Sequence, residues 1–122
     1  RGHFFAVVAR TMRHILVDHA RAAAATRRGG GAHVVRLSAL VDAGEGVALP
    51  GSNPLDLLVF DEALTELAEL RPRQARVLEL RAFGGLSVVE VAELLGVSRQ
   101  TVVLDTRLGR AWLVARLQRH SG

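Results

Sequence analysis

Apolar residues recur among polar ones at helical spacing over residues 87–119, in a pattern that predicts two helices joined by a tight turn. Ser87 can cap the first helix, and Glu90 three residues later completes a reciprocal capping pair. Gly96 lies where the turn needs a residue that tolerates a positive φ. Between the cap and this glycine, apolar residues recur at helical spacing at Val88, Val91, Ala92 and Leu95.

The second helix of the pair is predicted over residues 98–119, with Ser98 as its cap and Thr101 and Val102 in its first turn. Val97 can fill the space between the two helices. Two helices joined by a glycine turn are typical of proteins that place the second helix in the DNA major groove. The pattern therefore predicts a helix-turn-helix.

A long amphipathic helix is predicted over residues 3–25. Its apolar stripe consists of Phe5, Val8, Met12, Ile15 and Leu16. The charged and polar residues fall largely off that stripe, at Arg10, Arg13, His14, Asp18 and Arg21. A single amphipathic helix cannot bury its own stripe, so we expect it to pack on the C-terminal part, on another copy or on a partner protein.

Glycine and proline punctuate residues 26–54, which predicts a linker. Gly29-Gly30-Gly31 opens this segment without a preceding strand, which favours a linker over a phosphate-binding loop. The preceding Arg27 and Arg28 are either solvated or in contact with DNA backbone. The apolar run HVVRLSALV is expected to form a loop or a short helix, because no second strand is available for a sheet.

Two more helices are predicted before the helix-turn-helix, over residues 55–70 and 73–83. Asn53 can cap the first, and Asp56 in its first turn favours the helix dipole. Arg71-Pro72 separates the two helices, and Gly84-Gly85 ends the second. The residues that mark their faces are Leu57 or Leu58, Asp61, Leu64, Leu67, Ala68, Ala75, Leu78, Ala82 and Phe83.

Together these elements predict an all-α chain with a basic N-terminal helix in residues 1–28, a flexible linker in 29–53 and a four-helix domain in 54–122. A length of 122 residues suits one ordinary domain or two very small ones. The lack of cysteine excludes disulfides, zinc fingers and thiol catalysis.

Charge is unevenly distributed along the chain. Net charges of +6 over residues 1–36, −7 over 37–70 and +5 over 71–122 make up the total of +4. All 16 basic residues are arginine, which suits bidentate contacts with phosphate and guanine. Basic ends favour a polyanionic partner, while solvated helix faces would explain any single block equally well.

No apolar run in the sequence has the length of a membrane span, and no cleavable signal peptide is visible. The first residue is not methionine, which indicates a fragment or a processed start. We therefore expect a cytoplasmic protein without a membrane partner.

Helical spacing divides the helix at 98–119 into two faces. Val102, Thr106, Gly109 and Leu113 are expected to face inward, together with Leu117. Gln100, Val103, Leu104, Arg107 and Arg110 are expected to face outward, and Arg116 and Arg119 to stay in solvent. Arg99 and Gln100 can read guanine and adenine, whereas Arg107 and Arg110 can reach phosphates or bases.

Val103 and Leu104 cannot donate hydrogen bonds, which leaves three interpretations of this pair. The two side chains could touch thymine methyl groups, weaken DNA binding, or form a protein-binding face. At the helix starting at Ser87, backbone N–H groups can point at a phosphate. The predicted DNA-binding residues are Ser87, Ser98, Arg99, Gln100, Thr101, Val103, Leu104, Arg107 and Arg110.

The sequence also contains a possible metal-binding pair, a group of carboxylates and a single tryptophan. His14 and Asp18 share a helix face, but no third ligand at a clear spacing indicates a metal site. The carboxylates Asp61, Glu62, Glu66 and Glu69 lack an accompanying nucleophile or histidine, so we interpret them as a solvated face or an acidic surface for a basic partner. Trp112 is expected to pack in the core. We expect no enzyme activity, no cofactor and no metal.

The stretch LRPRQARVLELRAFGGLSVVEVAELLGVSRQTVVLDTRLGRAWL resembles the C-terminal DNA-binding domain of extracytoplasmic-function sigma factors, which initiate bacterial transcription. The opening HFFAVVARTMRHILVDHARAAAATRRGGG is similar to the end of that family's promoter-melting domain, whose last helix helps to read the −10 element. The resemblance implies promoter DNA and RNA polymerase as partners, with the −35 element in contact with the helix at 98–110. It also implies docking on the polymerase β-flap and sequestration by an anti-sigma factor.

The sequence departs from the family pattern in two places. The family's first three N-terminal helices have no counterpart here, so we expect that this chain does not initiate transcription unaided. The family usually has basic residues at the positions of Val103 and Leu104. Two alternatives remain: the output domain of a LuxR-type response regulator, which shares the same rhythm, and a degenerate sigma-like module that binds protein.

Overall fold

The computed structural model describes residues 2–26 and 54–121, which form α-helices and contain no strand. The helices are α1 (Gly2–Thr26), α3 (Pro54–Leu70), α4 (Pro72–Ala82), α5 (Val88–Leu95) and α6 (Arg99–Ser121). This confirms the predicted all-α class and the predicted helices to within a residue or two at most ends. The predictions for the linker, including HVVRLSALV, Arg27, Arg28 and the glycine run, and for Asn53 lie outside the described residues.

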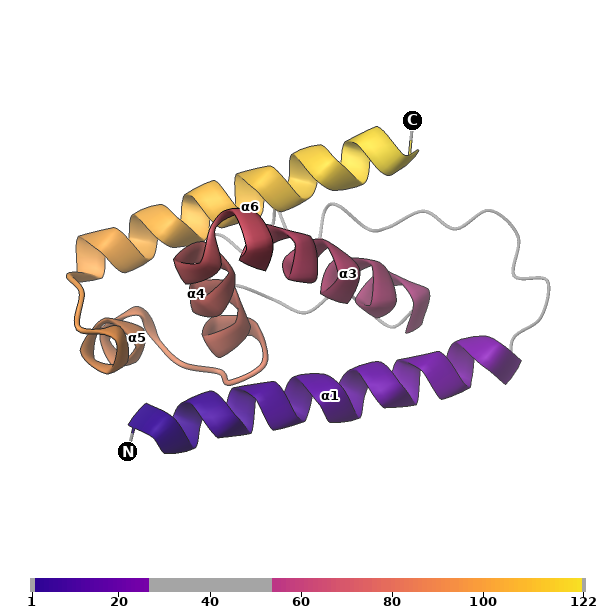
Figure 1. Ribbon diagram of the computed structural model, residues 1–122, viewed down its shortest axis with the longest axis horizontal. Helices are drawn as coiled ribbons and strands as arrows, with labels where there is room; N and C mark the ends of the chain where they lie inside the picture. The colour runs from indigo at the N-terminus through magenta and orange to yellow at the C-terminus, as the bar shows by residue number, and fades with distance from the viewer. Residues whose placement is uncertain (1, 27–53, 122) are drawn as a thin grey trace.

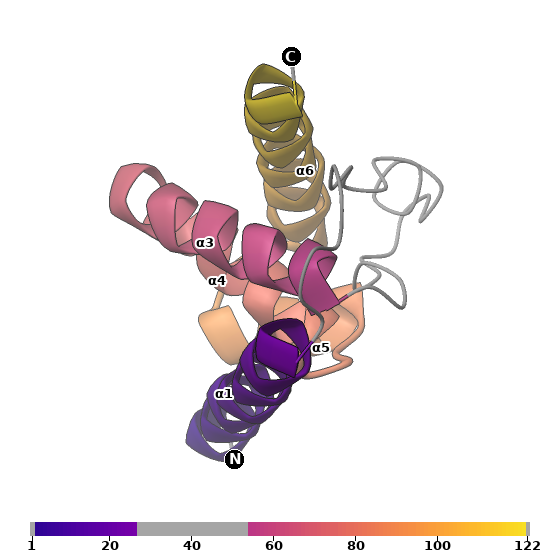
Figure 2. The same ribbon diagram turned by 90° about the vertical axis from the view of Figure 1, so that its right-hand side faces the viewer.

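The helices are arranged with α3 and α4 between α1 on one side and α6 on the other (Figures 1 and 2). The short helix α5 packs against α4 and against the first turns of α6 (Figure 1). In the part of the chain that the structure describes, no helix combines the length and apolar character needed to cross a membrane.

Two clusters of buried side chains form the core. The larger one joins α3, α4 and α6 and contains Phe60, Ala63, Leu64, Leu67, Ala75, Leu78, Phe83, Leu113 and Leu117. The smaller one joins the helix-turn-helix to α4 and α1 and contains Ala9, Val77, Leu80, Leu86, Val91, Ala92 and Val102. Trp112 packs against the larger cluster, as predicted. Because α1 supplies Ala9 to the smaller cluster, it packs on the C-terminal part of the same chain.

The buried face of α1 differs from the predicted apolar stripe. Met12 and Ile15 are 38% and 56% exposed, whereas the small residues Ala9, Val17 and Ala20 are buried. The predicted placement of Met12 and Ile15 is therefore wrong. The packed face is centred on Arg13, which a ranking by hydrophobicity puts on the solvent side. Its charge is compensated by acidic residues of α3 and α4, which the sequence of α1 does not reveal.

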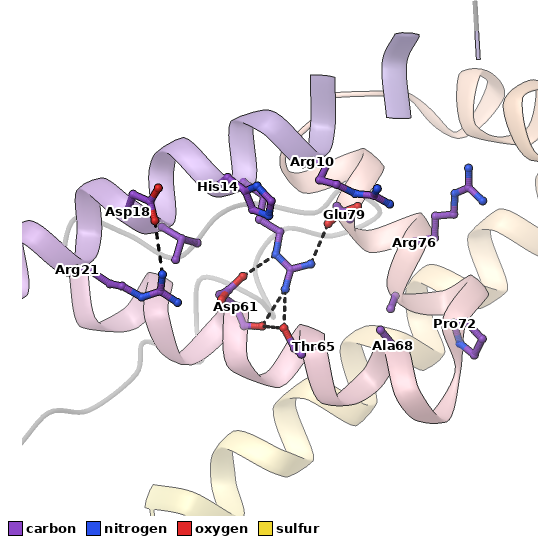
Figure 3. Close-up of a pocket in the computed structure, with 13 residues that line it drawn as sticks. Arg10, His14, Asp18, Arg21, Asp61, Thr65, Ala68, Pro72, Arg76 and Glu79 are labelled. Atoms are coloured by element: carbon purple, nitrogen blue, oxygen red, sulfur yellow. Dashed lines mark hydrogen bonds and ion pairs between the residues drawn. The ribbon is translucent and has the colours of Figure 1, made fainter. Parts of the chain in front are cut away.

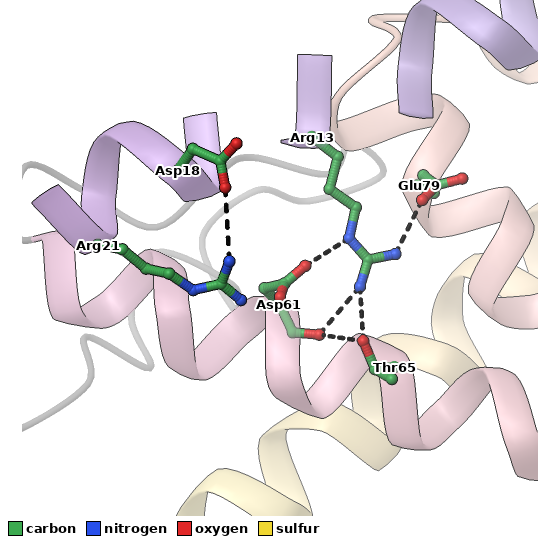
Figure 4. A network of polar contacts seen from close by, with 6 residues as sticks. All are labelled: Arg13, Asp18, Arg21, Asp61, Thr65 and Glu79. Atoms are coloured by element: carbon green, nitrogen blue, oxygen red, sulfur yellow. Dashed lines mark hydrogen bonds and ion pairs between the residues drawn. The ribbon is translucent and has the colours of Figure 1, made fainter. Parts of the chain in front are cut away.

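Arg13 makes four polar contacts with α3 and α4 (Figure 4). Its Nε donates to Asp61 Oδ1 at 2.5 Å and its Nη1 to Glu79 Oε2 at 2.8 Å. Its Nη2 donates to the Asp61 backbone oxygen at 3.0 Å and to Thr65 Oγ1 at 2.8 Å. Burial disfavours the charged form, but the bonds with Glu79 and Asp61 outweigh this effect and raise the pKa of Arg13. The guanidinium therefore ties α1 to two other helices.

The groove around Arg13 runs between α1, α3 and α4, and Arg10, Arg21 and Arg76 also line it (Figure 3). Arg21 forms an exposed ion pair with Asp18 at 3.4 Å. Some acidic side chains of α3 also face arginines of the same chain. Asp61 is engaged by Arg13 and is not a fully solvated residue, whereas Glu69 is exposed as predicted.

Arg116 is buried, so its predicted solvent exposure is wrong. Its guanidinium lies between α6 and α3, where Nε donates to Glu66 Oε2 at 2.7 Å and Nη2 also contacts Glu66. Glu62 lies 3.6 Å from the same guanidinium. Hydrogen bonding to Glu66 outweighs desolvation and raises the pKa of Arg116. Acidic residues of α3 therefore pair with both the buried Arg116 and the partly buried Arg13.

The caps of the helix-turn-helix agree with the sequence prediction. Ser87 Oγ accepts the Glu90 N–H at 3.2 Å, and Glu90 Oε1 accepts the Ser87 N–H at 2.8 Å. Gly96 adopts φ 69° and ψ 36°, the left-handed conformation that glycine tolerates best. Ser98 Oγ accepts the Thr101 N–H at 3.1 Å and starts α6. These local bonds fix both ends of the turn.

Replacing Ser87 with alanine is expected to lower the free energy of unfolding by about 1 kcal/mol, because the Glu90 N–H loses its acceptor. Urea denaturation followed by circular dichroism measures this loss. The matched control is Glu90→Gln, which keeps an acceptor for the Ser87 N–H and should cost less. An S87A protein as stable as the unsubstituted chain would contradict the role of the cap.

Candidate nucleic-acid interface

The inward face of α6 is the one that helical spacing predicts. Val102 and Leu113 are fully buried, Thr106 is 2% exposed, and Gly109 is also buried. The Thr106 hydroxyl donates to the Val102 backbone oxygen at 2.8 Å, which satisfies a polar group in the core. Burial of this face leaves the opposite face of α6 directed away from the core.

The outward face carries most of the predicted DNA-binding residues. Ser98, Arg99, Gln100 and Arg107 are exposed, and Leu104 is 55% exposed. Three others, Thr101, Val103 and Arg110, are partly exposed. The structure brings five of these side chains together around a shallow surface hollow, lined by Arg99, Gln100, Val103, Leu104 and Arg107.

Two of the predicted residues also cap helices, and a third, Thr101, is bonded to one of the caps. The Ser87 N–H and hydroxyl are engaged with Glu90, and the Ser98 hydroxyl with Thr101. Ser87 starts α5 and is not among the residues that line the hollow of α6. Contact of Ser87, Ser98 or Thr101 with a phosphate stays a prediction.

Helix α1 packs on α3 and α4 and lies on the side of the molecule away from α6 (Figures 1 and 2). The outward face of α6 is therefore not covered by α1. This arrangement leaves a helix with a buried inner face and an accessible outer face, the geometry that a recognition helix needs.

Two pairs of polar side chains connect α4 to α6, and the sequence pattern predicts neither pair. The buried Asp105 carboxylate accepts hydrogen bonds from Arg73 at 2.7 and 3.4 Å. These bonds raise the pKa of Arg73. Arg81 Nη1 lies 3.3 Å from Thr106 Oγ1. The only signal in the sequence is an acid that falls next to the inward positions of a helix, with arginines in the helix before it.

A close approach between α4 and α6 occurs at Gly109. A Cβ atom at this position would lie 2.8 Å from Cδ1 and 3.3 Å from Cγ of Leu78, and 3.7 Å from Cδ2 of Leu67. These distances to Leu78 are shorter than ordinary van der Waals contact, so a side chain at position 109 would force the buried leucine to move. Helical spacing predicts the inward position of Gly109, and the close approach to Leu78 explains why a glycine fits there.

The remaining candidate sites are the His14–Asp18 pair and the acidic residues of α3. Within residues 2–26 and 54–121, no group of three or more histidine, cysteine, aspartate or glutamate side chains is placed to hold a metal ion. His14 is exposed, and Asp18 pairs with Arg21. Asp61 pairs with Arg13 and Glu66 with Arg116, which gives these two acids of α3 a structural role.

The helices, the capped glycine turn and the accessible outer face of α6 define a helix-turn-helix protein. A family model described as ECF sigma factor matches residues 1–119, and the chain belongs to this family. No curated protein and no solved structure matches the chain.

Membership of this family makes the chain a sigma factor, a regulator of transcription initiation that works with RNA polymerase and promoter DNA. The match runs from α1 into the last turn of α6, so it includes the N-terminal helix. An output domain of a LuxR-type response regulator would not be expected to contain that helix. The sigma-factor interpretation of the sequence is thereby confirmed, and the response-regulator alternative is set aside.

Proposed function

We propose that this sigma factor reads the −35 element of its promoters with the outward face of α6. The observation that carries the proposal is the cluster around the hollow, where hydrogen-bonding side chains are exposed on the second helix of a helix-turn-helix. Such a helix presents its N-terminal turns to base edges in the major groove. The buried inner face and the caps hold these turns in a fixed orientation.

In this proposal the side chains divide by their chemistry. Arg99 and Gln100 are in the first turn of α6 and contact guanine and adenine, for which guanidinium and amide groups have matching donors and acceptors. Arg107 and Arg110 lie two to three turns further along and contact phosphates, which position the helix without reading sequence. Ser87, Ser98 and Thr101 add contacts near the starts of α5 and α6.

The partners beyond DNA follow from the resemblance to the family. We propose that the α3–α6 domain docks on the β-flap of RNA polymerase and that an anti-sigma factor sequesters it. Both partners would bind this domain in addition to the promoter, and neither step involves covalent chemistry.

Selection of binding sites from a random duplex library, with the whole chain as bait, tests the proposal. We expect one enriched motif that binds more tightly than a scrambled duplex. Arg99→Ala should weaken binding to this motif by about 5- to 150-fold, equivalent to 1–3 kcal/mol, while binding to the scrambled duplex changes little. Titration at several salt concentrations measures both effects.

Arg107→Ala serves as the matched comparison, because loss of a phosphate contact weakens both duplexes and lowers the salt slope by about one unit. Arg10→Ala on the far side of the molecule is the control that should change neither. Equal affinity for the selected and the scrambled duplex, with a shallow salt dependence, would contradict the proposed function.

A further inference from the structure

The hollow on α6 combines apolar side chains with hydrogen-bonding ones. Val103 and Leu104 lie between Arg99 and Gln100 on one side and Arg107 on the other. Because an α-helix turns once every 3.6 residues, these positions fall on one face over three consecutive turns. Leu104 belongs to neither core cluster and is 55% exposed, so folding of the chain does not require a large apolar residue there.

The chemistry of the major groove limits what these two side chains can contact. Guanine, adenine and cytosine present hydrogen-bond donors and acceptors there, and thymine adds its 5-methyl group. A leucine or valine against a donor or acceptor would remove water from it without replacing the hydrogen bond. Against a methyl group, the same side chain removes apolar surface from water, which is favourable.

We propose that Val103 and Leu104 select thymine by packing on its 5-methyl group. This inference rests on the proposed function, because it assigns a base to the face that would read the −35 element. It resolves the three interpretations of this pair in favour of direct readout. The selected element then contains thymine next to the purines that Arg99 and Gln100 contact.

The dimensions of the helix fit this arrangement. Val103 and Leu104 follow Arg99 and Gln100 by four residues, which is about 6 Å along the axis at 1.5 Å per residue. Adjacent base pairs are about 3.4 Å apart, so the thymine lies within about two base pairs of the purine contacts. Arg107 follows Val103 and Leu104 by another 3–4 residues, which is about 5 Å along the helix axis, and lies toward the DNA backbone beyond the thymine.

Charge around the hollow favours DNA over an apolar protein surface. Two of its five lining residues are arginines and none is acidic. The nearest acid along α6, Asp105, is buried and paired with Arg73. The two arginines of the hollow therefore attract a polyanion, and the apolar side chains of Val103 and Leu104 then discriminate between bases. A protein helix bound at Val103 and Leu104 is the competing occupant, and the experiment separates the two.

The test uses the whole chain and the duplex selected from the random library. Each thymine in that duplex is replaced in turn by deoxyuridine, which removes the 5-methyl group and keeps every hydrogen-bonding atom. Burial of one methyl group is worth about 0.8 kcal/mol, so we expect about fourfold weaker binding at one or two positions. The double variant V103A/L104A should bind the thymine and uracil duplexes alike.

Leu108→Ala is the matched control, since Leu108 is also exposed on α6, at 47%, but lies outside the hollow. This variant should keep the preference for thymine. Thermal melts of all variants report the fold, and the deoxyuridine scan with the unsubstituted chain tests the contact even if the double variant fails to fold.

Specific binding that is indifferent to every deoxyuridine substitution would overturn this inference and leave the proposed function intact. A thymine preference that persists in folded V103A/L104A would overturn the assignment to these residues. Equal binding to selected and scrambled duplexes would overturn both proposals and point to the protein-binding alternative.

Discussion

Leu78→Ala is expected to lower the free energy of unfolding by about 2–5 kcal/mol, the largest effect among the substitutions considered. Leu78 is fully buried in the larger core cluster, between α3, α4 and α6. Its removal costs the transfer free energy of the lost carbons and leaves a cavity that close-packed neighbours fill only in part. Urea denaturation followed by the fluorescence of Trp112, the single tryptophan, measures the loss.

The position of Leu78 against Gly109 sharpens this prediction. Gly109→Ala alone gains helix propensity of about 1 kcal/mol, but its new Cβ would lie 2.8 Å from Leu78 Cδ1 and force the buried leucine to move. In the Leu78→Ala background, the Cδ1 atom that the new Cβ would approach is absent. We therefore expect Gly109→Ala to give no stabilisation in the unsubstituted chain and about 1 kcal/mol of stabilisation in the Leu78→Ala background.

Leu70→Ala is the control for this cycle, because Leu70 is 56% exposed at the end of α3. Its effect should stay within about 0.5 kcal/mol. Additive effects of Leu78→Ala and Gly109→Ala would show that α4 and α6 do not meet at this crossing.

Arg13→Met is expected to cost about 2–3 kcal/mol and to release α1 from α3 and α4. Methionine keeps much of the apolar stem but leaves Asp61 and Glu79, at 19% and 15% side-chain exposure, without their cation. Breaking a fully buried pair costs about 3–5 kcal/mol, and the residual exposure of these carboxylates reduces that figure. Hydrogen exchange resolves the effect, since α1 should lose protection while α3, α4 and α6 keep theirs.

The neutral partners Asp61→Asn and Glu79→Gln, added to Arg13→Met, should restore part of the stability because they remove the uncompensated charges. Arg10→Met is the control, since Arg10 lines the same groove but is exposed. Unchanged protection of α1 in the Arg13→Met protein would show that apolar packing around Ala9 alone holds this helix.

Most of the fold follows from local patterns in the sequence. The capping pair of Ser87 and Glu90, the left-handed Gly96 and the spacing of Val102, Thr106 and Gly109 are properties of contiguous residues, and the structure confirms them. The division of α6 into an inner and an outer face follows from the same periodicity. These features depend on backbone geometry, which a single sequence encodes directly.

The errors concern charged residues that lie inward. The helical pattern places Arg13 off the apolar stripe of its helix and Arg116 in solvent. Each is compensated by a carboxylate 48 to 66 residues away in the sequence, in a helix that packs against its own. The pairing of Asp105 with Arg73 has the same origin. Periodicity within one helix cannot reveal such partners, because they depend on how the helices are placed in space.

The close approach at Gly109 also marks the point at which α6 crosses α4. Arg99 is ten residues from Gly109, so the first turn of α6 lies about 15 Å from the crossing along the helix axis. A tilt of α6 by about 10° at the crossing would displace its first turn by about 3 Å, roughly one base-pair step. Under the proposed function, substitutions in the core around Leu78 would therefore change which bases α6 contacts, even when every outward side chain of α6 stays the same.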